Sequence, residues 1–192
     1  MDNKKPEDIE QRFNELVMAW NRSINLVSRK KTNIYDLIED SKLFLNYIDF
    51  REGLRILDLG TGGGIPGVVI KVYHPEIQIT LIDSIHKKIK AITDIVQKLG
   101  MENIEILCSR AEELAKSKNY KNKFDYIVAR SVAALDDLVK WSKDLVKPGG
   151  RLVTVKGMDI TEELLRAQRF KCVKKTEFFT ENERKIVTVK FI

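Results

Sequence analysis

From residue 53 onward, short apolar runs alternate with segments in which apolar residues recur every three or four positions. The length of the runs is typical of strands buried in a parallel sheet, and the periodic segments between them indicate helices packed against that sheet. The pattern therefore predicts an α/β fold with a mostly parallel sheet and helices on both faces. The predicted strands are 56–59, 77–82, 104–108, 124–129 and 151–155.

Helix boundaries follow from the residues between these strands. The helix predicted over 85–99 ends at Gly100, which suits the left-handed position after a helix, and Lys147-Pro-Gly-Gly150 is predicted to end the helix before the fifth strand. Asp159 followed by Glu162 resembles a capping box for a short helix. The inward side chains predicted for the 85–99 helix are Ile85, Ile89, Ile92, Val96 and Leu99.

The two ends of the chain carry different patterns. Residues from about 7 to 50 read as helical, with one apolar stripe that includes Phe13, Val17 and Trp20. Segments 171–179 and 185–191 mix β-branched and aromatic residues and predict a terminal antiparallel hairpin. We therefore expect one domain, with a helical cap over 1–52 and a sheet-containing core over 53–192.

A glycine-rich turn follows the first predicted strand. Glycines at 60, 62, 64 and 67 let the backbone take positive φ and approach a ligand, and Pro66 is placed where the next helix should begin. Gly62, Gly64 and Gly67 fit the dinucleotide fingerprint G-x-G-x-x-G. The same turn, led by Asp58, fits the Asp-x-Gly-x-Gly-x-Gly pattern of S-adenosylmethionine (SAM) enzymes, so the turn alone leaves both nucleotide ligands open.

Polar residues follow the other predicted strands, where ligands of open α/β sheets bind. Asp83 follows the second strand, and its carboxylate can accept hydrogen bonds from two ribose hydroxyls. Glu112 after the third strand can read an exocyclic amine, and Arg130 after the fourth can hold an anionic group. Lys156 after the fifth strand is a weaker candidate.

Composition narrows the class of protein. The 192 residues are 43% hydrophobic, enough for a sizeable core, and their net charge of +6 favours a polyanionic partner. Neither a signal peptide nor an apolar run of membrane-spanning length is visible, so we expect a cytoplasmic protein. Cys108 and Cys172 have no metal-ligand spacing, so no metal site is predicted, and Cys108 lies in an apolar run that predicts burial.

Two absences restrict the chemistry further. The chain lacks the two adjacent prolines that occur in the signature of enzymes that methylate exocyclic amines. It also has no cysteine at a position for covalent attack on a pyrimidine. Methylation of a ring nitrogen such as guanine N7 needs neither device, since that atom already carries an in-plane lone pair. Catalysis of this kind leaves almost no signature, and Arg130 is the single candidate catalytic residue.

The order of these motifs resembles the RsmG family, also called GidB. The motifs are Leu57-Asp-Leu-Gly-Thr-Gly-Gly-Gly-Ile-Pro-Gly67, Leu81-Ile-Asp-Ser84, Ser109-Arg-Ala-Glu-Glu113, Phe124-Asp-Tyr-Ile-Val-Ala-Arg130, Lys147-Pro-Gly-Gly150 and Lys156-Gly157, with Trp20-Asn-Arg-Ser-Ile-Asn-Leu26, Asp40-Ser41 and Glu183-Arg184 outside the core. The Gly-Ile-Pro-Gly extension and the N-terminal motif are the family-specific parts. One departure is Leu37, where the family often has a histidine.

The resemblance implies a class I, Rossmann-like SAM-dependent methyltransferase that acts on guanine N7 in the 530 loop of bacterial 16S ribosomal RNA. The implied partner is that RNA or the small ribosomal subunit, and we expect a monomer without membrane association. The alternatives are a SAM- and RNA-binding assembly factor without turnover and, less favoured, an NAD-dependent oxidoreductase. The cofactor contacts that the resemblance implies are Gly60, Ile65, Asp83, Ser84, Ile85, Ala111, Glu112 and Arg130.

Overall fold

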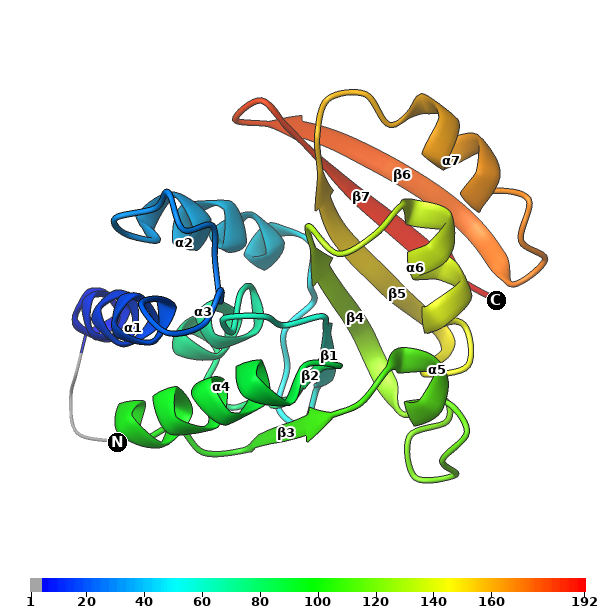
Figure 1. Ribbon diagram of the computed structural model, residues 1–192. Helices are drawn as coiled ribbons and strands as arrows, with labels where there is room; N and C mark the ends of the chain where they lie inside the picture. The colour runs from blue at the N-terminus through cyan, green and yellow to red at the C-terminus, as the bar shows by residue number, and fades with distance from the viewer. Residues whose placement is uncertain (1–4) are drawn as a thin grey trace.

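The computed structural model describes residues 5–192 and shows a seven-stranded sheet between two layers of helices (Figure 1). Residues 1–4, part of the N-terminal stretch on which the expected lack of a signal peptide rests, lie outside the described range.

The sheet order is β3-β2-β1-β4-β5-β7-β6. Strands β1 to β5 run parallel, β7 is antiparallel to β5, and β6 is antiparallel to β7. The predicted α/β fold with a C-terminal antiparallel hairpin is confirmed. The strands are β1 (Arg55–Leu59), β2 (Gln78–Asp83), β3 (Ile104–Cys108), β4 (Phe124–Arg130), β5 (Val146–Lys156), β6 (Val173–Glu181) and β7 (Arg184–Phe191).

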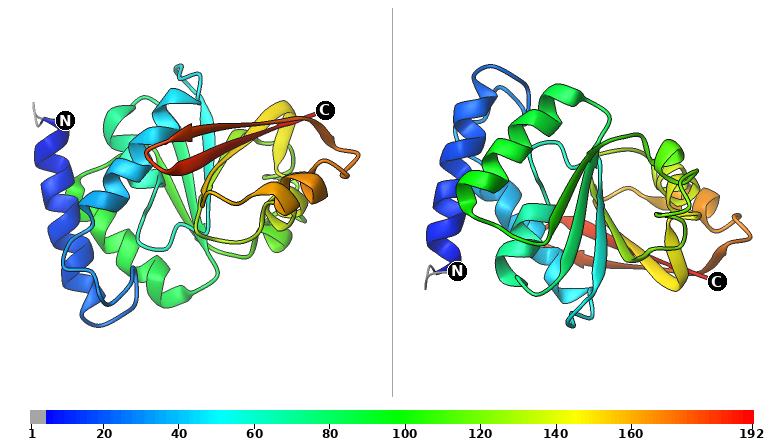
Figure 2. Two further views of the ribbon diagram at one scale, coloured as in Figure 1. Left: turned by 90° about the horizontal axis from the view of Figure 1, so that it is seen from above. Right: turned by 90° about the horizontal axis from the view of Figure 1, so that it is seen from below.

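The helices divide between the two faces of the sheet (Figures 1 and 2). One layer holds α1 (Pro6–Asn21), α2 (Tyr35–Lys42), the 3-10 helix η1 (Leu43–Asn46), α3 (Gly67–Tyr73) and α4 (His86–Leu99). The other holds α5 (Ala111–Leu114), α6 (Leu135–Ser142) and α7 (Thr161–Ala167). Successive side chains of a strand point to opposite faces of the sheet. Ile56 therefore packs into the hydrophobic cluster shared with α1 to α4, and Leu57 into the cluster shared with α5 to α7. Across residues 5–192, no helix is long and apolar enough to cross a membrane.

The N-terminal helices share a core with the sheet. Phe13 and Val17 of α1 are completely buried in the same cluster as Ile56 of β1. The Trp20 indole N–H also donates to Asp94 Oδ2 of α4 at 2.7 Å. The helical pattern predicted through residue 50 is interrupted between α1 and α2, where the Asn21 side chain accepts hydrogen bonds from the N–H groups of Leu26 and Val27.

Two burial predictions at the ends of elements are wrong. Cys108 is exposed, because it is the last residue of β3, an edge strand of the sheet. Ile85 is 47% exposed, because it precedes α4 as its N-cap and so lies outside the inward-facing stripe of that helix. Gly100 does end α4, with the predicted left-handed conformation (φ 67°).

Three boundary predictions also differ from the structure. Lys147-Pro-Gly-Gly150 lies within β5, opposite a register irregularity in β4, and so extends the strand instead of separating it from the helix. Pro66 is the N-cap of α3 and Gly67 its first residue, with a cis Ile65–Pro66 peptide bond. The N-cap of α7 is Ile160, so the predicted capping box of Asp159 and Glu162 does not form; Asp159 Oδ1 instead accepts a long hydrogen bond from the Thr161 N–H at 3.4 Å.

The shared core makes a prediction about stability. Phe13→Ala removes a completely buried ring between α1 and the sheet core, and we expect it to lower the free energy of unfolding by about 3–5 kcal/mol. Glu15→Ala on the exposed side of the same helix should change it by less than about 0.5 kcal/mol. Urea unfolding followed by circular dichroism measures both. Equal effects would show that α1 does not pack on the core as described.

Candidate functional site

The candidate site lies at the carboxyl ends of the parallel strands, where the strand order reverses between β1 and β4. Ligands of open α/β sheets bind at this point. Because β1 to β5 are parallel, the residues that follow them share one edge of the sheet. The structure thus places the glycine turn, Asp83, Glu112, Arg130 and Lys156 along the same edge.

The buried carboxylate of Asp58 organises the glycine turn. Its Oδ2 accepts hydrogen bonds from the Thr61 hydroxyl at 2.6 Å and from the Gly67 N–H at 2.9 Å. A Cβ on Gly67 would lie 2.6 Å from that oxygen and 2.4 Å from Leu81 Cδ2, so only glycine allows α3 to begin this close to the sheet. Asp58 Oδ1 is buried without a hydrogen-bond partner in the described part of the chain.

Gly60 is the glycine of the turn that lies against Val132, just after β4. Its φ of +74° is in the left-handed region, and a Cβ there would lie 2.8 Å from Val132 Cγ2. The N–H groups of Gly60 and Thr61 both donate to the carbonyl oxygen of Ile82, at 3.0 and 2.8 Å. The turn is therefore fixed to the end of β2 and lies in close contact with Val132.

Asp83 at the end of β2 is held by backbone donors. Its Oδ1 accepts from the Ile85 N–H at 2.9 Å, and its Oδ2 accepts from the Gly62 N–H at 3.1 Å, with Lys88 Nζ at 3.8 Å. Each carboxylate oxygen can accept a further hydrogen bond. The side chain is thus oriented between the glycine turn and α4, where its remaining lone pairs can accept the two hydroxyls of a ribose.

A first cavity, of about 150 Å³, lies between the ends of β1, β3 and β4. Leu59, Ile82 and Val132 supply apolar walls, while Ser84 and Glu112 supply polar edges. This combination suits a heterocycle with polar groups at its rim. The remaining residues around it are Gly60, Ser109, Arg110, Ala111 and Trp141.

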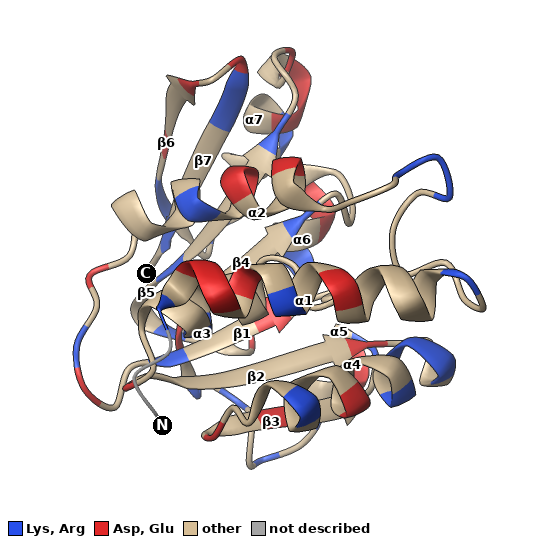
Figure 3. Ribbon diagram, turned by 90° about the vertical axis from the view of Figure 1, so that its left-hand side faces the viewer, with Lys and Arg blue, Asp and Glu red and all other residues tan. Residues whose placement is uncertain are grey.

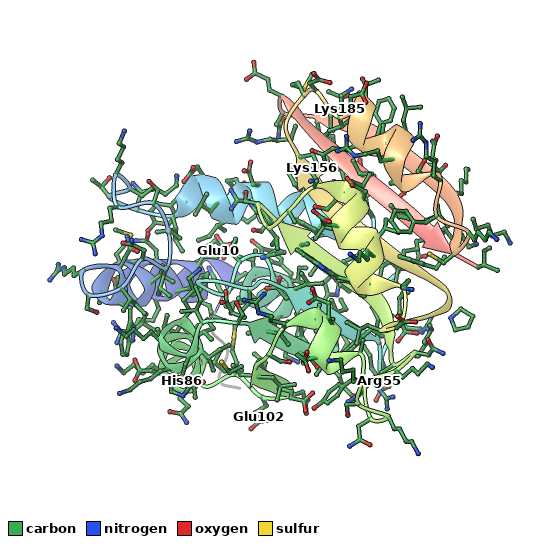
Figure 4. All side chains as sticks on the ribbon, turned by 45° about the vertical axis from the view of Figure 1, so that its right-hand side comes forward. Glu10, Arg55, His86, Glu102, Lys156 and Lys185 are labelled. Atoms are coloured by element: carbon green, nitrogen blue, oxygen red, sulfur yellow. The ribbon has the colours of Figure 1, made fainter. Side chains whose placement is uncertain are left out.

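A second cavity, of about 190 Å³, lies at the ends of β4 and β5 and the start of β7. Arg130 Nη2 is 3.2 Å from Asp40 Oδ2 of α2, and Arg184 Nε is 3.5 Å from the same oxygen. Lys156 also borders this cavity, but its Nζ pairs with Glu163 at 2.8 Å and donates to the Ala133 carbonyl (Figure 4). The second cavity is therefore polar and lined mainly by charged side chains.

The cofactor contacts expected from the sequence divide between these places. Gly60, Ser84, Ala111 and Glu112 border the first cavity, and Arg130 borders the second. Asp83 and the exposed Ile85 lie beside Ser84 at the start of α4. Ile65 belongs to none of these places: its side chain is buried in the hydrophobic core, and its N–H donates to the Thr61 carbonyl.

Sequence reasoning did not assign Asp40, Arg184 or Val132 to the site. Asp40 and Arg184 come from α2 and β7, at opposite ends of the chain, and no spacing signal links them. The one sequence signal for them is that they belong to two motifs of the family resemblance, Asp40-Ser41 and Glu183-Arg184. Among residues 5–192, no group of histidine, cysteine and acidic side chains could hold a metal ion.

Comparison with known proteins identifies the family. The family model described as GidB, rRNA small subunit methyltransferase G, matches residues 7–187. The chain belongs to this family. A ribosomal RNA small subunit methyltransferase G from Clostridium novyi is 36% identical over 159 residues, which are 82% of this chain and 65% of that protein. The one from Chlorobaculum tepidum is 40% identical over 158 residues, which are 81% of this chain and 70% of that protein. The chain thus spans about two thirds of the length of these relatives.

A solved structure supports the same fold. A SAM-dependent O-methyltransferase from Thermotoga maritima superposes with a TM-score of 0.63 at 16% sequence identity, over 80% of this chain and 65% of that one. At this identity the match concerns the fold alone. The class I, Rossmann-like architecture is confirmed. The fold alone does not specify a function, so the residues of the two cavities must carry what is particular to the GidB family.

Asp58 leads to a prediction about pH. Burial raises the pKa of Asp58 from 3.8 to about 7, against the hydrogen bonds from Thr61 and Gly67, and the negative charge of Asp83 adds to the rise. The folded state then binds this proton more tightly than the unfolded state, so the contribution of Asp58 to stability falls as pH rises from about 4 to 7 and levels off above.

The variant Asp58→Asn keeps the shape of the side chain but does not titrate. We expect its free energy of unfolding, relative to that of the native protein, to increase steadily from pH 4 to pH 7 and then to stay constant. Urea unfolding of both proteins at matched pH measures the difference, in which the other titrating groups cancel. A difference independent of pH would contradict the assignment.

Proposed function

We propose that this chain transfers a methyl group from SAM to guanine N7 in the 530 loop of bacterial 16S ribosomal RNA. The observation that carries the proposal is the edge of the sheet where the glycine turn, Asp83 and the first cavity meet. Membership of the GidB family supports the ribosomal RNA substrate, which the names of the relatives also specify. Position N7 and the 530 loop come from the motif resemblance described above.

The proposed division of roles follows the chemistry of each group. We propose that Asp83 accepts the ribose hydroxyls and that the first cavity, at Ala111 and Glu112, takes the adenine. When bound, SAM supplies an electrophilic methyl group on a sulfonium sulfur. Guanine N7 has a lone pair and loses no proton on methylation, so the chain has to position the base and needs no general base. The proposed cofactor-binding residues are Gly60, Ile65, Asp83, Ser84, Ile85, Ala111, Glu112 and Arg130.

Basic residues support RNA as the substrate. Figure 3 shows Lys and Arg on the loop between α1 and α2 and at the N-terminal end of α4. Both segments flank the edge of the sheet that carries the site, where a positive surface attracts an RNA backbone. The residues proposed to contact phosphates are Arg22, Arg29, Lys30, Lys31, Lys87, Lys88 and Arg110.

The organisation of the chain fits this role. We propose that the cap over 1–52 and the core over 53–192 form one domain, since a single hydrophobic cluster includes residues of both. We also propose that the protein acts as a monomer in the cytoplasm, where its ribosomal substrate is assembled, without membrane association.

The decisive test is methyl transfer itself. Purified protein, methyl-labelled SAM and small ribosomal subunits or their RNA should yield labelled RNA, and mass spectrometry should find N7-methylguanosine in the 530 loop. RNA from cells that lack the protein should miss this modification and regain it on complementation. Binding of SAM and RNA without methylated guanosine would instead indicate an assembly factor without turnover.

Asp83 provides a specific prediction about the cofactor. Asp83→Asn removes the charge that accepts the ribose hydroxyls, and loss of a charged hydrogen-bond acceptor should weaken SAM binding by about 10- to 100-fold. Glu102→Gln, an equal charge change just before β3 at the opposite edge of the sheet, serves as the control (Figure 4). Calorimetric titration with SAM compares them. Equal affinities would remove Asp83 from the cofactor site.

A further inference from the structure

The second cavity has more positive charge than its own side chains neutralise. One carboxylate, Asp40, faces the two guanidinium groups of Arg130 and Arg184, at 3.2 and 3.5 Å. The charge of Lys156 is already matched by Glu163. The cavity is thus left with about one positive charge in a partly enclosed space, where electrostatic interactions are stronger than in bulk water.

The two arginines also have hydrogen-bond donors to spare. Each guanidinium group carries five N–H donors in a planar fork. Within residues 5–192, the contacts with Asp40 are the only side-chain hydrogen bonds or ion pairs that Arg130 and Arg184 form. The side chains of Arg130 and Asp40 are only 14% and 18% exposed, so this geometry is largely fixed before a ligand arrives.

The lining of the second cavity favours a phosphate over a nucleobase. Unstacked RNA bases are usually held by aromatic side chains. No described residue that lines this cavity is aromatic. A planar guanidinium fork matches two oxygens of a phosphate group, and an RNA backbone offers one phosphate per nucleotide.

We propose that the second cavity binds one backbone phosphate of the RNA substrate, next to the guanosine that is methylated. Arg184 donates to the phosphate oxygens, Arg130 keeps its proposed place among the cofactor contacts, and Asp40 is a positioning residue that holds the two guanidinium groups together. This inference rests on the proposed function, because it takes RNA as the substrate. It adds a defined contact at the sheet edge to the diffuse attraction of the basic loops.

Arg184 is the residue to test, and its neighbour provides a matched control. Arg184 is 46% exposed, so its replacement does not open the core, and it is outside the proposed cofactor contacts. Lys185 has the same charge but points to the other face of β7, where it donates to the Thr180 hydroxyl at 3.0 Å and lies 4.4 Å from the centre of the Phe178 ring (Figure 4).

The experiment compares Arg184→Gln, Arg184→Lys and Lys185→Gln in the full chain. RNA affinity is measured over a range of KCl concentrations with a 530-loop RNA or with small subunits, and SAM affinity is measured in parallel. Loss of one phosphate contact should reduce the slope of log affinity against log salt by about 0.7–0.9 for Arg184→Gln. We expect about tenfold weaker RNA binding for this variant at low salt. Arg184→Lys should keep the slope and recover part of the affinity, because it retains the charge but not the fork.

In the same comparison, Lys185→Gln should leave the slope almost unchanged, and none of the three variants should alter SAM affinity. Equal slope changes for Arg184→Gln and Lys185→Gln would overturn the inference, because bulk charge would then explain both. Weaker SAM binding with unchanged RNA binding in Arg184→Gln would also overturn it, since the anion would then be the cofactor carboxylate. The wild-type methylation assay is independent: if it succeeds while Arg184→Gln binds RNA normally, only the phosphate site is wrong.

Discussion

The hydrogen bonds of one buried carboxylate, Asp58, hold the site together. They connect Thr61 of the glycine turn to Gly67, the first residue of α3. The N–H groups of Gly60 and Thr61 also donate to the Ile82 carbonyl at the end of β2. Among the described residues Oδ1 has no hydrogen-bond partner, and burial raises the pKa of the side chain to about 7 against the hydrogen bonds that Oδ2 accepts. The turn that these hydrogen bonds fix has Gly60 beside Val132 and the Gly62 N–H on Asp83.

The cap and the hairpin complete what the parallel strands begin. The first cavity is surrounded by the ends of β1 to β3 and the segments after them, with Val132 after β4 and Trp141 of α6 closing it, as the Rossmann-like fold provides in general. The second cavity exists because α2 brings Asp40 and β7 brings Arg184 to the ends of β4 and β5. A hydrogen bond from Tyr47, after η1, to Glu181 of β6 strengthens the same junction between cap and hairpin. The two cavities thus have different structural origins although they share one edge.

Sequence alone predicted the strands and most of their polar ends, because short apolar runs, a period of 3.6 residues and glycine turns are local signals. It failed where burial depends on neighbours far along the chain. Cys108 has the hydrophobic context of a core residue but ends an edge strand. The pairing of Asp40 with Arg130 and Arg184 depends on the packing of cap, sheet and hairpin, which no spacing in the sequence encodes.

The motifs shared with other SAM enzymes and the family motifs of the cap and the hairpin lie at different cavities. The glycine turn, which SAM enzymes of many kinds share, and the Ala111-Glu112 pair border the first cavity, whereas Asp40, Lys156-Gly157 and Arg184 border the second. Methyltransferases of this fold act on very different substrates, so the fold cannot specify the acceptor. A cavity assembled from the cap and hairpin can change without disturbing the cofactor turn. It is therefore the place on this sheet edge where selectivity for the proposed RNA acceptor can reside.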